Sequence, residues 1–396
     1  MNTASNIYLS ASTFVLVLAT LFGCNREEQE PQNGFSFSSS FSEVDYSTYS
    51  ATPFVSVEDS IILDKLERMK EVQNIGENFV SRLEASGKIE ISDGSQISLI
   101  ELSKNECPQE RFAACNQTNS EDLGTKSSVL LTSFAEMEES VKSQGERGTC
   151  VAHAMASAAE LLGRRAGYDL QLSEQHLYFE AKKATDTWND SGLVPSHTFS
   201  QLTNSSTPIA SESAWPYNPS HENCQSYLEA HPDAACSRTE AQGVGELFTD
   251  PDPKTAEGDR YVIDKAHQLY ASVGRIKQAL HFGFPVVLSV NINKDFELAD
   301  MNCNSKIKAK VLSSHCKQGY ASWVFKFSGC EGICGHAMLA FGYADDPEVE
   351  GGGVVFIKNS WGSSWSDNGI VTVSYKWLEN SLLDAQAIVS VSLLSE

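Results

Sequence analysis

The earliest periodic pattern in the chain is helical. Apolar side chains stand at helical spacing after residue 57, and the positions that define the pattern are Ile62, Leu66, Met69, Phe79 and Leu83. This spacing predicts an amphipathic helix, and Gly87 stands where a C-cap would end it. Residues 88–102 then alternate apolar and polar positions around Ser92-Asp93-Gly94, which predicts two short strands joined by a turn.

Downstream, helical and extended patterns occupy different parts of the chain. Residues 152–162 form a helix-favouring segment. Residues 286–292 and 354–358 are short continuous apolar runs of the kind that buried strands show. We therefore expect the region 128–396 to begin with helices and to continue with a sheet.

The first part of the chain carries neither pattern. Residues 7–22 form an apolar run that is shorter than a membrane-spanning helix, so residues 1–23 are predicted to be a signal peptide. Residues 21–24, Leu-Phe-Gly-Cys, resemble the processing box of bacterial lipoproteins, in which Cys24 would be acylated. An ordinary cleaved signal is the alternative. Residues 24–56 are polar, Ser-rich and acidic, which predicts a disordered tether.

These features predict an exported protein. It would be anchored to a bacterial cell envelope through a lipid on Cys24, or secreted after processing. The net charge is −23, from 29 Lys and Arg against 52 Asp and Glu. Such an acidic chain argues against nucleic acid and against anionic lipid headgroups as partners. A lipid on Cys24 would therefore be the only membrane attachment.

One run of polar and small residues carries the most chemistry. Residues 143–154 read SQGERGTCVAHA and place an amide, two glycines and a thiol ahead of the helix-favouring segment. A thiolate at a helix N-terminus is stabilised by the helix dipole, so we expect the pKa of Cys150 to be lowered. The Gln144 side chain and the Cys150 backbone N–H could together stabilise an oxyanion. A nucleophile also needs a base and an orienting group, and His336 and Asn359 offer both.

Each of these residues has a simpler interpretation when it is taken alone. A buried cysteine usually packs as a small apolar side chain. A histidine ahead of an apolar run is commonly a core residue, and an asparagine commonly belongs to a turn. The functional interpretation therefore depends on finding the residues together and in order.

Four blocks in order carry a resemblance to the papain-like cysteine peptidases. They are residues 144–150, 172–177 (LSEQHL), 335–343 and 357–362, with weaker similarity at 211–217 and 284–287. The resemblance covers residues 128–396, which it identifies as a catalytic domain. It implies an α+β, two-lobed fold, with a helical lobe, an antiparallel β-barrel-like lobe and the active site in the cleft between them. Residues 57–127 would then be a pro-region that blocks the cleft, or an accessory segment that packs permanently on the catalytic domain.

The resemblance also implies a role for each matching residue. Cys150 would attack the scissile carbonyl, His336 would act as base and acid, and Asn359 would orient the imidazole. Gln144 would donate to the oxyanion, and Trp361 would shield the His–Asn hydrogen bond.

Three glycines complete the predicted site. Gly148 would allow close approach of the chain at the turn into the helix. Gly192 and Gly335 are weaker candidates for substrate binding. No cofactor and no metal are expected.

The implied function is hydrolysis of peptide bonds through a thioester acyl-enzyme, with a protein or peptide as substrate. Two alternatives are open. One is an amidase or transpeptidase acting on cell-wall peptides. The other is a non-catalytic surface lipoprotein that uses the papain-like fold as a binding scaffold.

The chain departs from the family pattern at three positions. Val151 stands where the family often has Trp, Arg147 where it often has a disulfide-forming Cys, and Gly335 where Asn or Asp is common. The first two should alter packing and the local disulfide, and the third leaves the subsites unpredicted. His153 lies one helical turn after Cys150, and we expect it to be packed or hydrogen-bonded.

The chain has ten cysteines, and setting aside Cys24 and Cys150 leaves eight. They fall in near pairs: Cys107 with Cys115, Cys224 with Cys236, Cys303 with Cys316, and Cys330 with Cys334. Local disulfides are the simplest pairing, because an exported protein meets oxidising conditions. Six of the eight lie in residues 219–260 and 302–334, which we expect to be surface insertions. Zinc is disfavoured, because the chain has no Cys-x-x-Cys pair.

Overall fold

The computed structural model describes a defined part of the chain: residues 59–86, 88–90, 96–98, 127–145, 147–185, 192–217, 219, 259–292, 296, 320–321 and 334–394. The predicted signal peptide, Cys24 and the tether lie outside these ranges. The predicted disulfides and most of the two predicted insertions also lie outside them.

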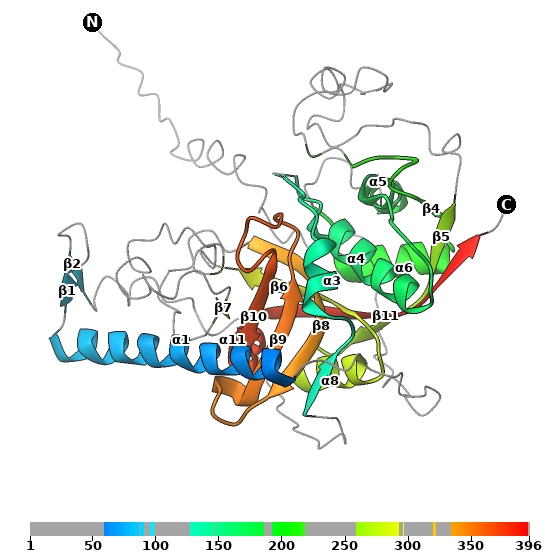
Figure 1. Cartoon of the computed structure of the whole chain (residues 1–396). Coiled ribbons are helices and arrows are strands. Elements are labelled where there is room, and N and C mark those ends of the chain that lie inside the picture. The colour runs from blue at the N-terminus through cyan, green and yellow to red at the C-terminus, as the bar shows by residue number, and fades with distance from the viewer. Residues whose placement is uncertain are drawn as a thin grey trace, which may run out of the picture.

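The N-terminal helix and hairpin are confirmed. Helix α1 spans Asp59–Ser86, and strands β1 (Lys88–Glu90) and β2 (Gln96–Ser98) pair antiparallel. In the first half of α1, Ile62, Leu66 and Met69 are buried in the main hydrophobic core. This face packs toward the β10 end of the sheet, so α1 is joined to the rest of the protein rather than standing apart (Figure 1). No helix within the described ranges is long and apolar enough to cross a bilayer.

A largely antiparallel sheet forms the centre of the molecule. Its strands run in the order β4-β5-β11-β6-β8-β9-β10-β7, and β3 pairs with β8. Among the strands that the structure describes, only the β7–β10 pair is parallel. The bounds are β3 (Ser128–Leu130), β4 (Ile209–Ala210), β5 (Arg260–Leu269), β6 (Val286–Ile292), β7 (Tyr320–Ala321), β8 (Cys334–Asp345), β9 (Gly353–Lys358), β10 (Ile370–Ser374) and β11 (Leu382–Leu394). The buried strands predicted at 286–292 and 354–358 are thus β6 and β9.

The barrel-like part of the fold prediction is wrong for the described strands. The sheet is open, because the two ends of its strand order, β4 and β7, do not pair with each other. Each of these end strands has two residues, which is too short a ladder to close a barrel. The confirmed statement is the coarser one, a mixture of helices with an antiparallel sheet.

Helices cluster in the first half of the region, as predicted. They are α3 (Phe134–Glu139), α4 (Cys150–Arg165), α5 (Glu174–Thr185) and α6 (Pro195–Asn204). Figure 1 shows α4, α5 and α6 in green beside the orange strands. Helix α4 is buried on most of its faces and contacts β8, β6 and β11, which makes it the central helix. The helices α8 (Val273–His281) and α11 (Tyr375–Ser381) and the short η5 (Glu350–Gly352) lie along the second half.

Candidate active site

Cys150 is the first residue of α4 and is a free, half-buried cysteine. The backbone N–H groups of Ala337, Val151 and Cys150 itself lie near its sulfur and act to lower its pKa. Ala337 follows His336 directly on β8, so the thiol lies against the strand that carries the imidazole. The topology therefore joins two residues that are far apart in the sequence, because α4 packs on β8.

The expected lowering of the Cys150 pKa is not found. Burial raises the pKa of the thiol above its ordinary value, and the three backbone N–H groups offset this only in part. The physical reason is that removing water from a thiolate costs more than a few peptide dipoles return. The unliganded site therefore holds a neutral thiol.

His336 lies in the middle of the sheet, opposite Val290 of β6, and is buried. Its Nε2 is 2.7 Å from Asn359 Oδ1. The same Oδ1 accepts the Ser360 backbone N–H at 2.8 Å, so it is an acceptor and Nε2 must donate the proton. Nδ1 then carries the lone pair. Burial lowers the pKa of His336 to about 4, although the bond to Asn359 acts in the opposite direction.

Asn359 stands at the base of a tight connection between β9 and β10. Its backbone N–H donates to Gly369 O at 2.9 Å, one residue before β10 begins. Gly369 has φ +84°, and a Cβ at this position would lie 2.4 Å from Val141 Cγ1. Only glycine satisfies both conditions. The backbone of the sheet thus fixes where Asn359 meets His336.

Trp361 covers the imidazole, as predicted. Its ring stacks on the His336 ring with centroids 4.7 Å apart and an interplanar angle of 27°. The ring in turn packs edge-on against Trp365, and Phe296 lies against both tryptophans. This aromatic cluster covers one face of the imidazole, and burial is the main cause of the lowered pKa of His336.

Gln144 is held on the Asn359 loop by several hydrogen bonds. Its backbone N–H donates to Ser360 O at 2.8 Å, and its Oε1 accepts the Ser360 hydroxyl at 2.6 Å. Its Nε2 donates one hydrogen to Arg147 O at 2.8 Å. Because an amide nitrogen carries two hydrogens, these contacts fix the direction of the second one. An oriented N–H of this kind is the group that an oxyanion requires.

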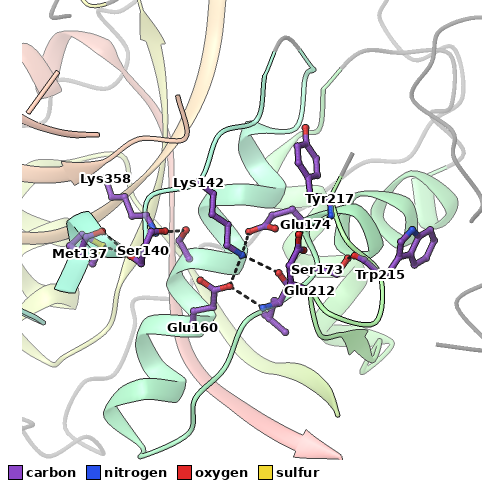
Figure 2. A network of polar contacts seen from close by, with 12 residues as sticks. Met137, Ser140, Lys142, Glu160, Ser173, Glu174, Glu212, Trp215, Tyr217 and Lys358 are labelled. Carbon is purple, nitrogen blue, oxygen red and sulfur yellow. Dashed lines mark hydrogen bonds and ion pairs between the residues drawn. The ribbon is translucent and has the colours of Figure 1, made fainter. Parts of the chain in front are cut away.

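Buried and half-buried charges join α4 to α5 through Lys142. Figure 2 shows Lys142 Nζ between Glu160 at 3.0 Å and Glu174 at 2.7 Å, two carboxylates that raise its pKa. Burial and the nearby carboxylates raise the pKa of Glu212 to about 7. Burial also lowers the pKa of Lys358 to about 8, and its ammonium donates to Ser140 and Ser157. A network that holds several charges is stable only while each has its partners.

The glycines occupy different parts of the site. Gly192 has φ +83°, and the nearest atom to a Cβ there would be Gly148 O at 3.8 Å. Gly148 and Gly192 therefore face each other beside the thiol. Gly335 is exposed at the start of β8, next to His336, with open space where a side chain would lie. Cys24 lies outside the described residues.

The expectation for His153 is confirmed. Its ring is buried, its Nδ1 is 3.0 Å from Thr149 O, and it packs edge-on against Tyr217. Sequence reasoning did not identify Ser360, Tyr217 or Phe296 as part of the site. Ser360 and Tyr217 lie inside quoted blocks, but no spacing rule shows which partners their hydroxyls take. Within the described ranges, no three His, Cys, Asp or Glu side chains are grouped to hold a metal ion.

Comparison with known proteins agrees with the resemblance over part of the chain. Residues 291–390 match the model of the papain family cysteine protease. This segment contains His336 and Asn359 but not Cys150. The match to the family model therefore lies in the second half of the chain.

Two curated relatives are similar over a longer stretch. The thiol protease aleurain of Arabidopsis thaliana is 25% identical over 233 residues, which is 58% of this chain and 50% of the relative. An uncharacterized peptidase C1-like protein of Acanthamoeba polyphaga mimivirus is 24% identical over 243 residues, 61% of this chain and 66% of the relative. The chain therefore spans between half and two thirds of the length of these relatives.

Solved cysteine proteases resemble the structure more loosely. Xylellain from Xylella fastidiosa has 19% identity and a TM-score of 0.48, over 68% of this chain and 87% of that one. Bromelain from Ananas comosus, solved with the E64 inhibitor, has 18% identity and a TM-score of 0.40, over 67% of this chain and all of that one.

Proposed function

We propose that the protein is a papain-like cysteine endopeptidase with Cys150, His336 and Asn359 as its triad. One observation carries the proposal. The Cys150 sulfur lies against the Ala337 N–H, while the neighbouring His336 donates from Nε2 to Asn359. A thiol, a nitrogen lone pair on Nδ1 and an orienting amide are thereby gathered from three adjoining segments: the start of α4, strand β8 and the residue after β9. This is the arrangement that nucleophilic catalysis by a thiol needs.

The reaction begins with a neutral pair. As the Cys150 sulfur attacks the scissile carbonyl carbon, the thiol proton passes to His336 Nδ1. The carbonyl oxygen becomes an oxyanion that accepts from the Cys150 N–H and the free Gln144 N–H. His336 then returns the proton to the leaving amine and a thioester remains. Water, deprotonated by His336, attacks the thioester, releases the carboxylate product and restores the thiol.

Labelling and hydrolysis test this proposal together. A thiol-directed epoxide should label Cys150, and the protein should cleave a generic peptide substrate under reducing conditions. Cys150→Ala should abolish both, and His336→Ala should lower the hydrolysis rate by at least about 10³-fold. His197→Ala changes an exposed histidine on α6 and serves as the matched control. Full hydrolytic activity in Cys150→Ala would rule the proposal out.

The substrate is proposed to be a protein or peptide outside the cytoplasm. The apolar run at residues 7–22 and the sequence before Cys24 support export with lipid attachment. Mass spectrometry of the mature N-terminus tests this. A diacylglycerol adduct on Cys24 is expected, and an unmodified N-terminus at another residue would contradict lipidation.

We propose further that residues 57–127 are a removable pro-region. The support is that α1 docks on the sheet through Ile62, Leu66 and Met69, and that Lys65 pairs with Asp367 at 2.7 Å. Asp367 lies in the loop that follows Asn359, so α1 is attached close to the site. N-terminal sequencing of active protein should show a start after residue 120. Active protein that still begins at Cys24 would instead favour permanent packing.

A further inference from the structure

The loop before the thiol, residues 144–149 (the thiol loop), is held by a buried arginine. The sequence motif did not explain the role of this residue. Arg147 is 1% exposed. Its Nη1 donates to Gln175 Oε1 on α5 at 2.7 Å. Its guanidinium lies over the Tyr178 and Tyr217 rings, 5.4 and 5.3 Å from their centroids. A planar cation held between two rings and an amide is rigid, because it has few other positions.

The Tyr217 hydroxyl contacts both ends of the thiol loop. Its hydroxyl donates to Gln144 O at 2.7 Å and lies 2.7 Å from Thr149 Oγ1. A phenol has one proton, so the Thr149 hydroxyl must donate to Tyr217. The Tyr217 backbone N–H is held in turn by Glu212 Oε1 at 2.8 Å. Figure 2 shows Tyr217 and Glu212 beside Glu174, at the edge of the buried charge network.

These contacts act on both oxyanion donors. The Arg147 carbonyl accepts one hydrogen of Gln144 Nε2, so the place of Arg147 sets the direction of the other hydrogen. Thr149 is the N-cap of α4, but its side chain does not cap the helix, because the hydroxyl is engaged with Tyr217. The first N–H groups of α4 therefore have no competing side-chain acceptor from Thr149. The N-terminal N–H groups of a helix are the ones that can bind an anion.

We propose that Arg147 and Tyr217 are positioning residues that hold the Gln144 and Cys150 N–H donors for the oxyanion and do not activate the thiol. The inference rests on the proposed function. It separates two properties that are usually lost together. The reactivity of the thiol depends on His336, whereas the stabilisation of the tetrahedral intermediate depends on the thiol loop.

Two reactions at the same sulfur test the separation. Alkylation by iodoacetamide needs the Cys150–His336 pair but forms no oxyanion. Hydrolysis of a peptide anilide needs the same pair and also the stabilisation of an oxyanion. Tyr217→Phe should lower kcat for the anilide by about 10-fold, a fraction of the loss for removing an oxyanion donor, and leave KM and the alkylation rate within about twofold. Arg147→Met should act in the same way. Arg147→Lys should recover only part of the loss, because an ammonium lacks the planar fork.

Tyr375→Phe is the matched control. It removes the hydroxyl of a buried tyrosine, which donates to Asp345 at 2.7 Å at the opposite end of β8 from His336. It should leave both rates unchanged. If hydrolysis and alkylation fall in parallel in Tyr217→Phe and Arg147→Met, or if neither falls, the proposal is wrong.

Amide hydrogen exchange decides the matter independently of activity. Tyr217→Phe should speed exchange at the backbone amides of residues 144–151 and leave the rest of α4 unchanged. Unchanged exchange in this loop would overturn the inference. A parent protein that neither hydrolyses the anilide nor is labelled at Cys150 would refute the proposed function. The exchange measurement would still test whether Tyr217 holds the thiol loop in place.

Discussion

The two sides of the site are held by different kinds of interaction. On the imidazole side, His336 lies within β8 and Asn359 follows β9, so the register of adjacent strands sets their distance. On the thiol side, the thiol loop, which includes Gln144, is part of no strand, and the chain beside it makes only an isolated bridge. Their places depend on side chains such as Arg147, Tyr217 and Ser360. The imidazole side is therefore fixed by the backbone, and the thiol side is fixed by side-chain partners.

Substitutions on the two sides should therefore have different effects. Backbone register tolerates the loss of most single side chains, but it does not tolerate a new atom in a crowded turn. A loop held by hydrogen bonds should respond to single hydroxyl or carboxyl changes.

Removing the orienting amide should have the largest effect. In Asn359→Ala, His336 Nε2 loses its acceptor, so the ring can rotate and take the other tautomer. We expect kcat/KM to fall on the order of 10²- to 10³-fold, about 3 to 4 kcal/mol of transition-state stabilisation. Asn204→Ala, at an exposed position on α6, is the control and should be neutral. A loss below tenfold would show that Trp361 and the strand hold the ring without Asn359.

Gly369→Ala should destabilise the imidazole side. The residue has φ +84°, and the added Cβ would meet Val141 Cγ1 at 2.4 Å. Positive φ costs about 1 kcal/mol and overpacking about 2 more, so the free energy of unfolding should fall by about 3 kcal/mol. Gly167→Ala has a similar φ of +87° with nothing within 4 Å, and should lose only about 1 kcal/mol. Urea unfolding measures both, and equal losses would exclude crowding as the cause.

Glu212→Gln should change how the stability of the thiol side depends on pH. Burial, with the neighbouring carboxylates, raises the pKa of Glu212 from 4.5 to about 7 in the folded protein. As pH rises from 4.5 to 7, the unfolded chain loses this proton first, so the free energy of unfolding falls. The contribution is about 2 kcal/mol once partial exposure is allowed for. The variant should lack this slope and should keep the acceptor for Tyr217.

Urea unfolding at pH 5 and pH 7 measures this slope. Glu139→Gln removes an exposed carboxyl from α3 and is the control, which should keep the parent slope. An unchanged slope in Glu212→Gln would mean that another carboxyl of the network carries the raised pKa.

The contrast between the two sides also explains what could be predicted from the sequence. Strands β6 and β9 and helix α4 were predictable, because short-range apolar patterns encode them. Asn359, His336 and Trp361 could be proposed because they lie in short blocks next to those strands. The open sheet could not be predicted, because closure depends on pairing between strands that are distant in the sequence.

The thiol side was predictable only as a list of residue types. The place of Cys150 ahead of a helix was clear, but the lowered pKa expected from the helix dipole was wrong. Burial decides that pKa, and a motif does not report how deeply a residue is buried. The partners of Arg147 lie on α5 and in the segment 211–217, so no local pattern shows them.

The smallest expected effect concerns the aromatic cover of the imidazole. His336 has its pKa lowered to about 4 by burial, so it stays neutral and able to accept the thiol proton down to that pH. As pH falls through about 4, the ring takes a proton and kcat/KM should fall, which places the acid limb of the profile there. Trp361→Ala opens one face of the ring to water, so the acid limb should move up toward 6.5, while the rate near pH 7.5 drops less than about threefold. Trp365→Ala removes a ring that touches Trp361 but does not stack on His336, and should leave the limb near 4. If the two variants have the same limb, the lowered pKa comes from the depth of the strand within the sheet and not from the aromatic cover.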